Sequence, residues 1–379
     1  MLAFSAAIRL YFNNIVQFMT EADEGTYFDY AQRLWSGGIG QYADLVRTYI
    51  GDRDMWLFPS PLRWSWIGTT AIASSIAGEC TYRVLATVSM LAGIATVALT
   101  WHIARELFDD RIALIAAAFA ATSPLQLALG RRALADEFFG ALVLATIASL
   151  LWYTDKLRAC RVRQALQLVP WVVFATLTFG AKEQFLLVYP LLLGFWWLRT
   201  RTIDLRTLIA WALPGLLYFA IFCALAHDVR AFFTIAHLTT STIGAEYPEQ
   251  YQNGAPHRLL IDLIALAPVV MLLAIAAIGR LRNATKNERH LLALLAGIFV
   301  VHGLLSSKNV RYIIEADALV RIVAASFVVS EIRSNRWITA LIAINAAIEL
   351  AIFNVVFLAG AVYDPVTSEL LRTLKMLPH

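Results

Sequence analysis

The sequence has little charge and few cysteines. Only 15% of its 379 residues are Asp, Glu, Lys or Arg, whereas a soluble domain carries about 25%. Because 59% of the residues are hydrophobic, this shortage of charge excludes an ordinary water-soluble globule. The cysteines Cys80, Cys160 and Cys223 lack the spacing of zinc ligands. We therefore expect neither a zinc site nor a disulfide.

The alternating apolar and polar residues of a membrane barrel are also missing. The apolar stretches run unbroken instead, as in LIAWALPGLLYFAIFCALA at residues 208–226. Their length approaches the ~20 residues that a helix needs to cross the hydrocarbon core. The sequence therefore predicts an all-α polytopic membrane protein.

Eleven stretches are predicted to span the membrane. They cover residues 2–19, 84–106, 112–129, 138–153, 167–180, 184–199, 207–226, 259–279, 291–306, 314–331 and 337–362. Short loops rich in Lys and Arg begin at Arg105, Lys156, Arg199, Arg280 and Arg333, and such loops are usually cytoplasmic. We take the net charge of +4 as part of this topology signal rather than as a sign of nucleic-acid binding.

This topology places the N-terminus in the cytoplasm of a plasma or inner membrane protein. The long segments 20–83 and 227–258 then lie on the opposite, outer face, as does the tail 363–379. A single membrane domain, residues 1–362, is predicted to hold the whole functional site.

Segment 62–78 is apolar enough to suggest a further span. Counting it would move the Arg-rich loops at 156–163 and 199–206 to the outside, against the positive-inside rule. We therefore predict an interfacial helix in the first outer loop. Trp35, Trp56, Trp64 and Trp66 fit the headgroup level, where aromatic rings are favoured.

Ionisable residues gather at the outer ends of the predicted spans rather than in their middles. The acids are Asp23, Glu24, Asp136 and Glu137, and the bases are Arg131, Arg132, Lys182, Lys308 and Arg311. A carboxylate that activates a hydroxyl, beside cations that hold a phosphate leaving group, would have this composition. The plainer alternative is a set of loop charges that pair with each other and with lipid headgroups.

The segment EADEGTYFDYAQRLWSGG at residues 21–38 resembles a known motif. Asp23 and Glu24, followed by Tyr27, Ala31 and Gly37, are similar to the DExxY pattern of the protein mannosyltransferase and aminoarabinose transferase families of the GT-C class. The resemblance continues in chain order through FPSPLRW at 58–64, LGRRALADEF at 129–138, TFGAKEQFLLVYPLLL at 178–193 and SSKNVRYIIEADALVRIVA at 306–324.

Three positions depart from the family pattern. Glu183 stands where the family has a glycine after its lysine, and a proline is missing at residues 316–318. No lysine precedes Pro61, which argues against the aminoarabinose branch. The acceptor is therefore not specified by the resemblance.

The resemblance implies an inverting glycosyltransferase that moves a mannose-like hexose from a polyprenyl-phosphate donor to an acceptor hydroxyl on a protein, glycan or lipid. The implied catalytic residues are Asp23, as general base, with Glu24 and Asp136, which are also the candidate ligands of a divalent metal. Tyr27 and Glu137 are expected to contact substrate. The expected donor-phosphate ligands are Arg131, Arg132, Lys182, Lys308, Arg311 and Tyr312.

Two other interpretations remain open from the sequence. A transporter or flippase of lipid-linked sugar would share the number of spans, although the paired broken helices of such folds are not evident. A catalytically silent scaffold is the other alternative, against which the intact Asp23, Glu24 and Asp136 count. His237 and His257 in the outer loop either contact the sugar or are incidental.

Overall fold

The structure is a computed structural model that describes residues 1–16, 18–156, 161–241 and 254–359. Throughout these ranges the chain folds into helices and their connections, which confirms the predicted all-α class. The predicted tail and Cys160 lie outside the described residues.

The first helices are α1 (Leu2–Asn13), α2 (Asp23–Gly37), α3 (Gln41–Gly51), η1 (Arg53–Leu57) and α4 (Trp64–Ala77). The central ones are α5 (Tyr82–Leu107), α6 (Asp110–Ala121), α7 (Pro124–Gly130), α8 (Ala135–Lys156), α9 (Arg161–Phe179), α10 (Phe185–Thr200) and α11 (Leu205–Ala226). The last are α12 (Val229–Ser241), α14 (Arg258–Leu266), α15 (Pro268–Gly279), α16 (Lys286–Leu304), η2 (Val310–Ile313), α17 (Ile314–Glu331), α18 (Asn335–Ile352) and η3 (Phe353–Ala359).

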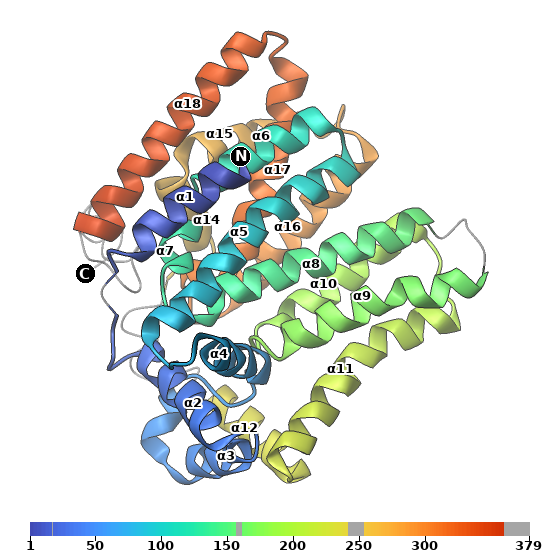
Figure 1. Ribbon diagram of the computed structural model, residues 1–379. Coiled ribbons are helices and arrows are strands. Elements are labelled where there is room, and N and C mark those ends of the chain that lie inside the picture. The colour runs from blue at the N-terminus through green and yellow to red at the C-terminus, as the bar shows by residue number, and fades with distance from the viewer. Residues whose placement is uncertain (17, 157–160, 242–253, 360–379) are drawn as a thin grey trace.

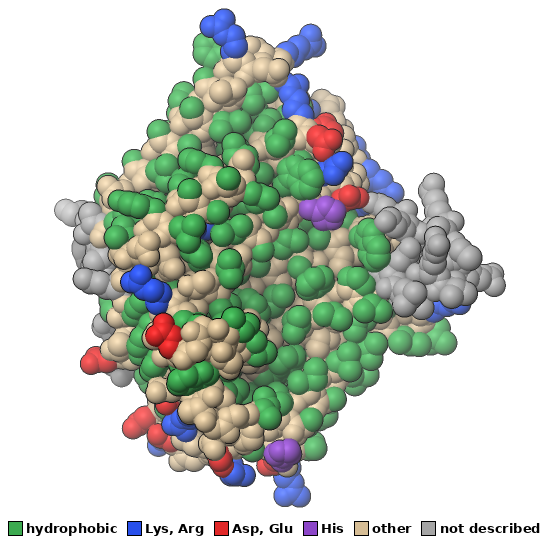
Figure 2. All heavy atoms as spheres, in the orientation of Figure 1, with side chains coloured by type: hydrophobic (Ala, Val, Ile, Leu, Met, Phe, Trp, Pro, Cys, Tyr) green, Lys and Arg blue, Asp and Glu red, His purple; other side chains and the backbone are tan. Residues whose placement is uncertain are grey.

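The long helices form a bundle, and the short helices α2, α3 and α4 of segment 20–83 gather at one end of it (Figure 1). In that view α8 runs beside α5 and α9, whereas α4 is seen nearly end-on and therefore lies across the long helices. Hydrophobic side chains cover much of the surface between the two ends (Figure 2). The charged side chains visible there lie mostly toward the ends, as expected for a bundle surrounded by lipid.

Four described helices are long and apolar enough to cross a membrane on their own. They are Tyr82–Leu107, Ala135–Tyr153, Leu205–Ala226 and Asn335–Leu358, and the bent pair α6 and α7 would add a fifth. Shorter apolar helices fill several of the other predicted spans. The count of eleven spans stays a prediction.

Three predicted spans are not continuous helices. The span 112–129 is α6 followed by α7, bent by 57° where Ser123 caps α7 and Pro124 begins it. The span 259–279 is divided between α14 and α15 at Ala267, just before Pro268. Proline lacks a backbone N–H and favours the first turn of a new helix. The helix predicted at 2–19 ends at Asn13.

Segment 62–78 forms helix α4 as expected, but one of its tryptophans is not at the surface. Trp66 is completely buried, with its ring 5.8 Å from that of Tyr27 and 5.5 Å from that of Phe138. Trp66 therefore packs against protein side chains, and the level of this helix in the membrane stays a prediction. Ser65 at the start of α4 donates hydrogen bonds to the carbonyls of Gly180 and Leu177. These bonds fix the first outer loop on the end of α9.

The bundle interior contains charges that the sequence pattern did not predict. Arg321 in α17 contacts both carboxylate oxygens of Asp317 at 3.0 Å, and its Nη1 lies 2.8 Å from Glu349 Oε1 in α18. Asp317 also accepts hydrogen bonds from Ser123 and Gln126 at the α6–α7 bend. Because both carboxylates contact the same guanidinium, this cluster joins α7, α17 and α18 with each ion next to an opposite charge.

Replacing Arg321 with methionine should strongly destabilise the protein, because it leaves two buried carboxylates without their cation. The expected loss is ~3–5 kcal/mol, seen as a lower unfolding temperature in detergent. Arg280→Met is the matched control, since Arg280 pairs with Glu331 at the surface and should lose only ~0–1 kcal/mol. Equal changes in the two variants would contradict a structural role for the buried cluster.

Candidate active site

The acidic motifs found in the sequence occupy the first turns of two helices. Asp23 and Glu24 begin α2, and Asp136 and Glu137 are in the first turn of α8. Carboxylates are favoured there because the backbone N–H groups and the helix dipole present positive charge. Ion pairs then join these turns to cations from distant segments.

Asp23 is paired with Arg311 of η2. Arg311 Nη2 lies 2.9 Å from Asp23 Oδ2, and the two side chains are 14% and 23% exposed. This pair joins segments that are almost 300 residues apart in the sequence. Because both side chains remain partly exposed, a solute that reaches this end of the bundle can contact them.

Asp136 is paired with Lys182, which lies in the loop between α9 and α10. Lys182 Nζ is 2.5 Å from Asp136 Oδ1, and each side chain is only 5% exposed. The ammonium group also lies 4.8 Å from the ring centre of Tyr312, next to Arg311 in the chain. Burial lowers the pKa of Lys182 below its usual value, and the carboxylate of Asp136 offsets only part of that effect.

Glu24 has a different environment from Asp23, although the two are adjacent. Its carboxylate accepts hydrogen bonds from Nε and Nη2 of Arg132 at 3.0 and 2.7 Å. It also accepts the backbone N–H groups of Ala133 at 2.8 Å and Met19 at 2.7 Å. Glu24 is completely buried, so these four bonds fasten the segment before α2 to the loop before α8.

This arrangement does not fit the hypothesis that Glu24 and Asp136 share a metal ion, because nearby donors already use the Glu24 oxygens. Within the described ranges, no group of three or more His, Cys, Asp or Glu side chains is placed to bind a metal.

A third ion pair was missed in the sequence. Arg63 Nε lies 2.8 Å from Glu183 Oε2, and Ser60 also donates to Glu183. Burial alone would raise the pKa of Glu183, but Arg63 and the hydrogen bond from Ser60 hold it below its usual value. Glu183, the departure from the family glycine, thus anchors the first outer loop beside Lys182. The sequence signal that could have identified Glu183 as a site residue is its position directly after Lys182.

Tyr27 belongs to the same cluster and does not face an open cavity. Its hydroxyl is bonded to Arg63, and the residue is only 1% exposed. Burial is the main cause that raises the pKa of Tyr27 above its usual range. The structure therefore supports a packing role for Tyr27 rather than the predicted contact with substrate.

Several other predicted site residues contact groups outside the pairs of Asp23 with Arg311 and Asp136 with Lys182. Glu137 is fully buried, and it approaches Gly93 from the same side as Arg9 of α1. Arg131 donates to the carbonyl of Phe357 at 2.8 Å, which holds η3 against the loop before α8. Lys308 is 4% exposed and donates to the carbonyl of Leu305.

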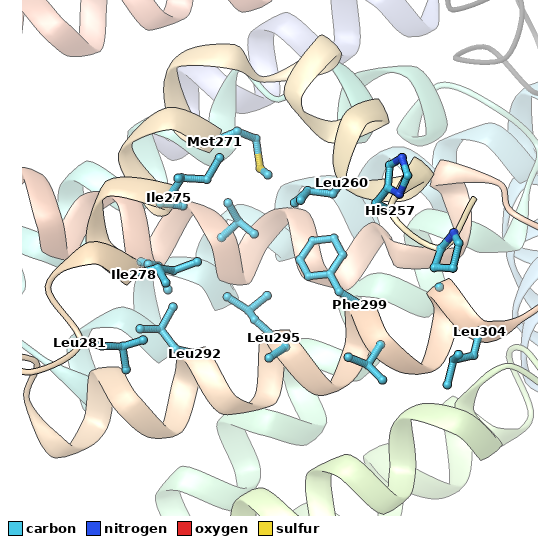
Figure 3. Close-up of a pocket in the computed structure, with 17 residues that line it drawn as sticks. His257, Leu260, Met271, Ile275, Ile278, Leu281, Leu292, Leu295, Phe299 and Leu304 are labelled. Atoms are coloured by element: carbon cyan, nitrogen blue, oxygen red, sulfur yellow. The ribbon is translucent and has the colours of Figure 1, made fainter. Parts of the chain in front are cut away.

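The two candidate histidines are also separated from each other. His237 is exposed on α12, a helix in a segment predicted as loop. His257 lies at one end of an apolar groove between α14, α15 and α16 (Figure 3).

Residues 60–227 match the family model described as dolichyl-phosphate-mannose-protein mannosyltransferase. The matched range contains Arg131, Arg132, Asp136 and Lys182, but it begins after the Asp23 motif and ends before Arg311. No curated protein matches the sequence significantly.

Solved structures share the fold over most of the chain. The apo structure of ArnT from Cupriavidus metallidurans has a TM-score of 0.57 at 17% identity, covering 88% of this chain and 62% of that one. The same protein bound to undecaprenyl phosphate gives 0.59 at 16% identity, with 88% and 63% covered. The apo oligosaccharyltransferase from Archaeoglobus fulgidus gives 0.54 at 14% identity, with 97% and 55% covered.

This chain thus spans less than two thirds of the length of each of these proteins. At such identities the structural matches establish the fold alone. Together with the family match over residues 60–227, they confirm the predicted resemblance to GT-C glycosyltransferases of the protein mannosyltransferase and aminoarabinose transferase type.

Proposed function

We propose that this protein is a membrane glycosyltransferase that moves a sugar from a polyprenyl-phosphate donor to an acceptor hydroxyl. The observation that carries the proposal is the arrangement at one end of the bundle, where Asp23 pairs with Arg311 and Asp136 with Lys182. Bases and phosphate-binding cations are thereby held together. The undecaprenyl phosphate bound to ArnT supports a lipid of this kind, and the family description supports a mannose-like hexose.

The proposed reaction is a single displacement. Asp23 accepts the proton of the acceptor hydroxyl, and the oxygen of that hydroxyl forms a bond to the anomeric carbon of the sugar. The bond from that carbon to the phosphate oxygen breaks, and the polyprenyl phosphate leaves with the electron pair. Arg311 and Lys182 stabilise the charge that develops on the leaving group, and the anomeric configuration inverts.

The ion pairs suggest that the donor binds before Asp23 activates the acceptor hydroxyl. Without donor, the Arg311 guanidinium is paired with the Asp23 carboxylate. A phosphate group competes for the same guanidinium, because Arg binds phosphate through two parallel hydrogen bonds. Donor binding therefore releases Asp23 for the acceptor. Asp136, kept close to Lys182, orients that lysine toward the phosphate.

We assign Glu24 and Arg132 to positioning rather than to contact with the reacting atoms. Their bonds determine where α2 begins and how the loop before α8 is folded, and both Asp23 and Asp136 depend on these elements. Arg131 and Glu183 support the same region through η3 and through Arg63.

The proposed topology places this site on the non-cytoplasmic face, with the N-terminus in the cytoplasm and eleven spans. The basic loops given above support this orientation. We do not favour a transporter, because the charges found within the bundle at Asp317, Arg321 and Glu349 are paired with each other.

The Asp23→Asn variant should lose sugar transfer by roughly 10²–10⁴-fold, because the amide does not accept the acceptor proton. The assay uses purified protein in liposomes, a panel of radiolabelled polyprenyl-phosphate sugars and a membrane extract as acceptor. Asp29→Asn is the control, since Asp29 pairs with Arg33 at the surface of the same helix. Unchanged transfer by Asp23→Asn would refute the role of Asp23 as general base. No transfer by wild type from any donor would refute the proposed glycosyltransferase activity.

Glu24→Gln should lower stability more than Asp23→Asn, because only the first leaves a buried guanidinium without its counter-ion. We expect a loss of about 3–5 kcal/mol for Glu24→Gln, measured as a fall in unfolding temperature in detergent. Asp23→Asn should stay close to wild type, since its ion pair is partly exposed. The positioning role of Glu24 fails if its substitution abolishes transfer while the unfolding temperature is unchanged.

A further inference from the structure

A buried histidine links α16 to the loop that carries Lys182. His302 is in the last turn of α16, and only 1% of it is exposed. Its ring nitrogen Nδ1 lies 2.9 Å from the carbonyl oxygen of Ile298, and its Nε2 lies 2.8 Å from the side-chain nitrogen of Gln184. A buried polar ring costs free energy unless it is hydrogen-bonded, and here both ring nitrogens have a partner.

Gln184 connects this histidine to η2. It stands directly before α10, two residues after Lys182, and its side-chain nitrogen also donates to the carbonyl oxygen of Tyr312. An amide nitrogen carries two hydrogens, so one Gln184 side chain can donate to both partners. The end of α16, the start of α10 and η2 thus share one chain of hydrogen bonds.

The partners determine the direction of each hydrogen bond in this chain. The carbonyl of Ile298 only accepts, so Nδ1 of His302 carries the proton. The carbonyl of Tyr312 also only accepts, which assigns the amide nitrogen of Gln184, and not its oxygen, to the side that faces η2. Nε2 of His302 then accepts the second hydrogen of that nitrogen. In this arrangement His302 is neutral, and it is the acceptor that orients Gln184.

The residue that Gln184 holds lies between the two cations that are proposed to bind phosphate. The ring centre of Tyr312 is 4.8 Å from Lys182 Nζ and 5.7 Å from the guanidinium carbon of Arg311. Because η2 is only four residues long, its position depends on contacts with the surrounding helices. A shift of η2 would change the distance between the charges of Arg311 and Lys182. Gln184 opposes such a shift, since only one residue separates it from Lys182 in the chain.

We propose that His302 is a positioning residue for the proposed transfer reaction. Through Gln184 it fixes the backbone at Tyr312, and this sets the spacing at which Arg311 and Lys182 contact one phosphate. The inference rests on the proposed function and extends it, because it assigns the spacing of the cations to a histidine that contacts neither donor nor acceptor. A small displacement matters, since a misplacement of ~1 Å can lower a rate by about 10²-fold.

The test compares two substitutions of His302 that differ in hydrogen bonding. His302→Leu fills the space of the ring without accepting a hydrogen bond, whereas the side-chain oxygen introduced by His302→Gln accepts one from Gln184. We expect sugar transfer to fall by roughly 10–100-fold in His302→Leu and by less than about threefold in His302→Gln. His290→Leu is the matched control, because His290 is a second buried histidine near the start of α16, with its ring 6.5 Å from that of Phe195.

A binding measurement separates displaced cations from a general loss of folding. Undecaprenyl phosphate and undecaprenol differ only in the phosphate, and each is added to the full chain in nanodiscs. His302→Leu should weaken binding of the phosphate by roughly tenfold and leave binding of the alcohol unchanged. Gln184→Met should give the same pattern, and it replaces His302→Leu if that variant fails to fold. The double variant should bind no more weakly than either single one, because both substitutions break the same chain of hydrogen bonds.

The possible outcomes separate the two proposals. Equal transfer by His302→Leu and His290→Leu, at equal unfolding temperatures, would overturn the positioning role alone. An equal loss in His302→Gln and His302→Leu would also overturn it, since the accepted hydrogen bond would then make no difference. Equal weakening of phosphate and alcohol binding in His302→Leu would assign His302 to general stability instead. A wild type that binds undecaprenyl phosphate no better than undecaprenol would refute the phosphate site, and this inference with it.

Discussion

The attraction between carboxylates at helix N-termini and cations from distant loops determines the architecture of the site. Glu24 with Arg132, Asp23 with Arg311 and Asp136 with Lys182 join four segments that an apolar bundle alone would not align. These pairs differ in exposure, and exposure decides their roles. The pair of Glu24 and Arg132 is buried and hydrogen-bonded, so it stabilises the position of α2. The pair of Asp23 and Arg311 is partly exposed, so each side chain can exchange its partner for a ligand.

The same principle explains the rest of the molecule. In the bundle interior, Arg321, Asp317 and Glu349 bring opposite charges into contact. The outer surface of the bundle is apolar where lipid is expected, and the charged side chains visible there lie mostly toward its ends (Figure 2). A donor with a hydrocarbon tail and an anionic head would match both features, which is why the charge distribution supports the proposed function.

Much of this could be predicted from the sequence, because helix-forming apolar runs and ordered motifs are local properties. The helical class and the meeting of Asp23, Asp136, Lys182 and Arg311 were predicted in this way. The difference in exposure between Asp23 and Glu24 was not predicted. Neighbouring residues in a helix point about 100° apart, and the sequence does not state which direction is inward. The burial of Trp66 was missed for the same reason. The pair of Arg63 and Glu183 was missed because each residue alone resembles an ordinary loop charge.

The central claim is that donor phosphate takes Arg311 from Asp23 and also contacts Lys182, which stays paired with Asp136. An experimental structure of the protein with bound polyprenyl phosphate tests it most directly. The account predicts a phosphate within hydrogen-bonding distance of both cations, with the contact between Asp23 and Arg311 broken and Asp23 facing the open side of the site. A phosphate bound elsewhere, with the pair of Asp23 and Arg311 intact, would contradict it.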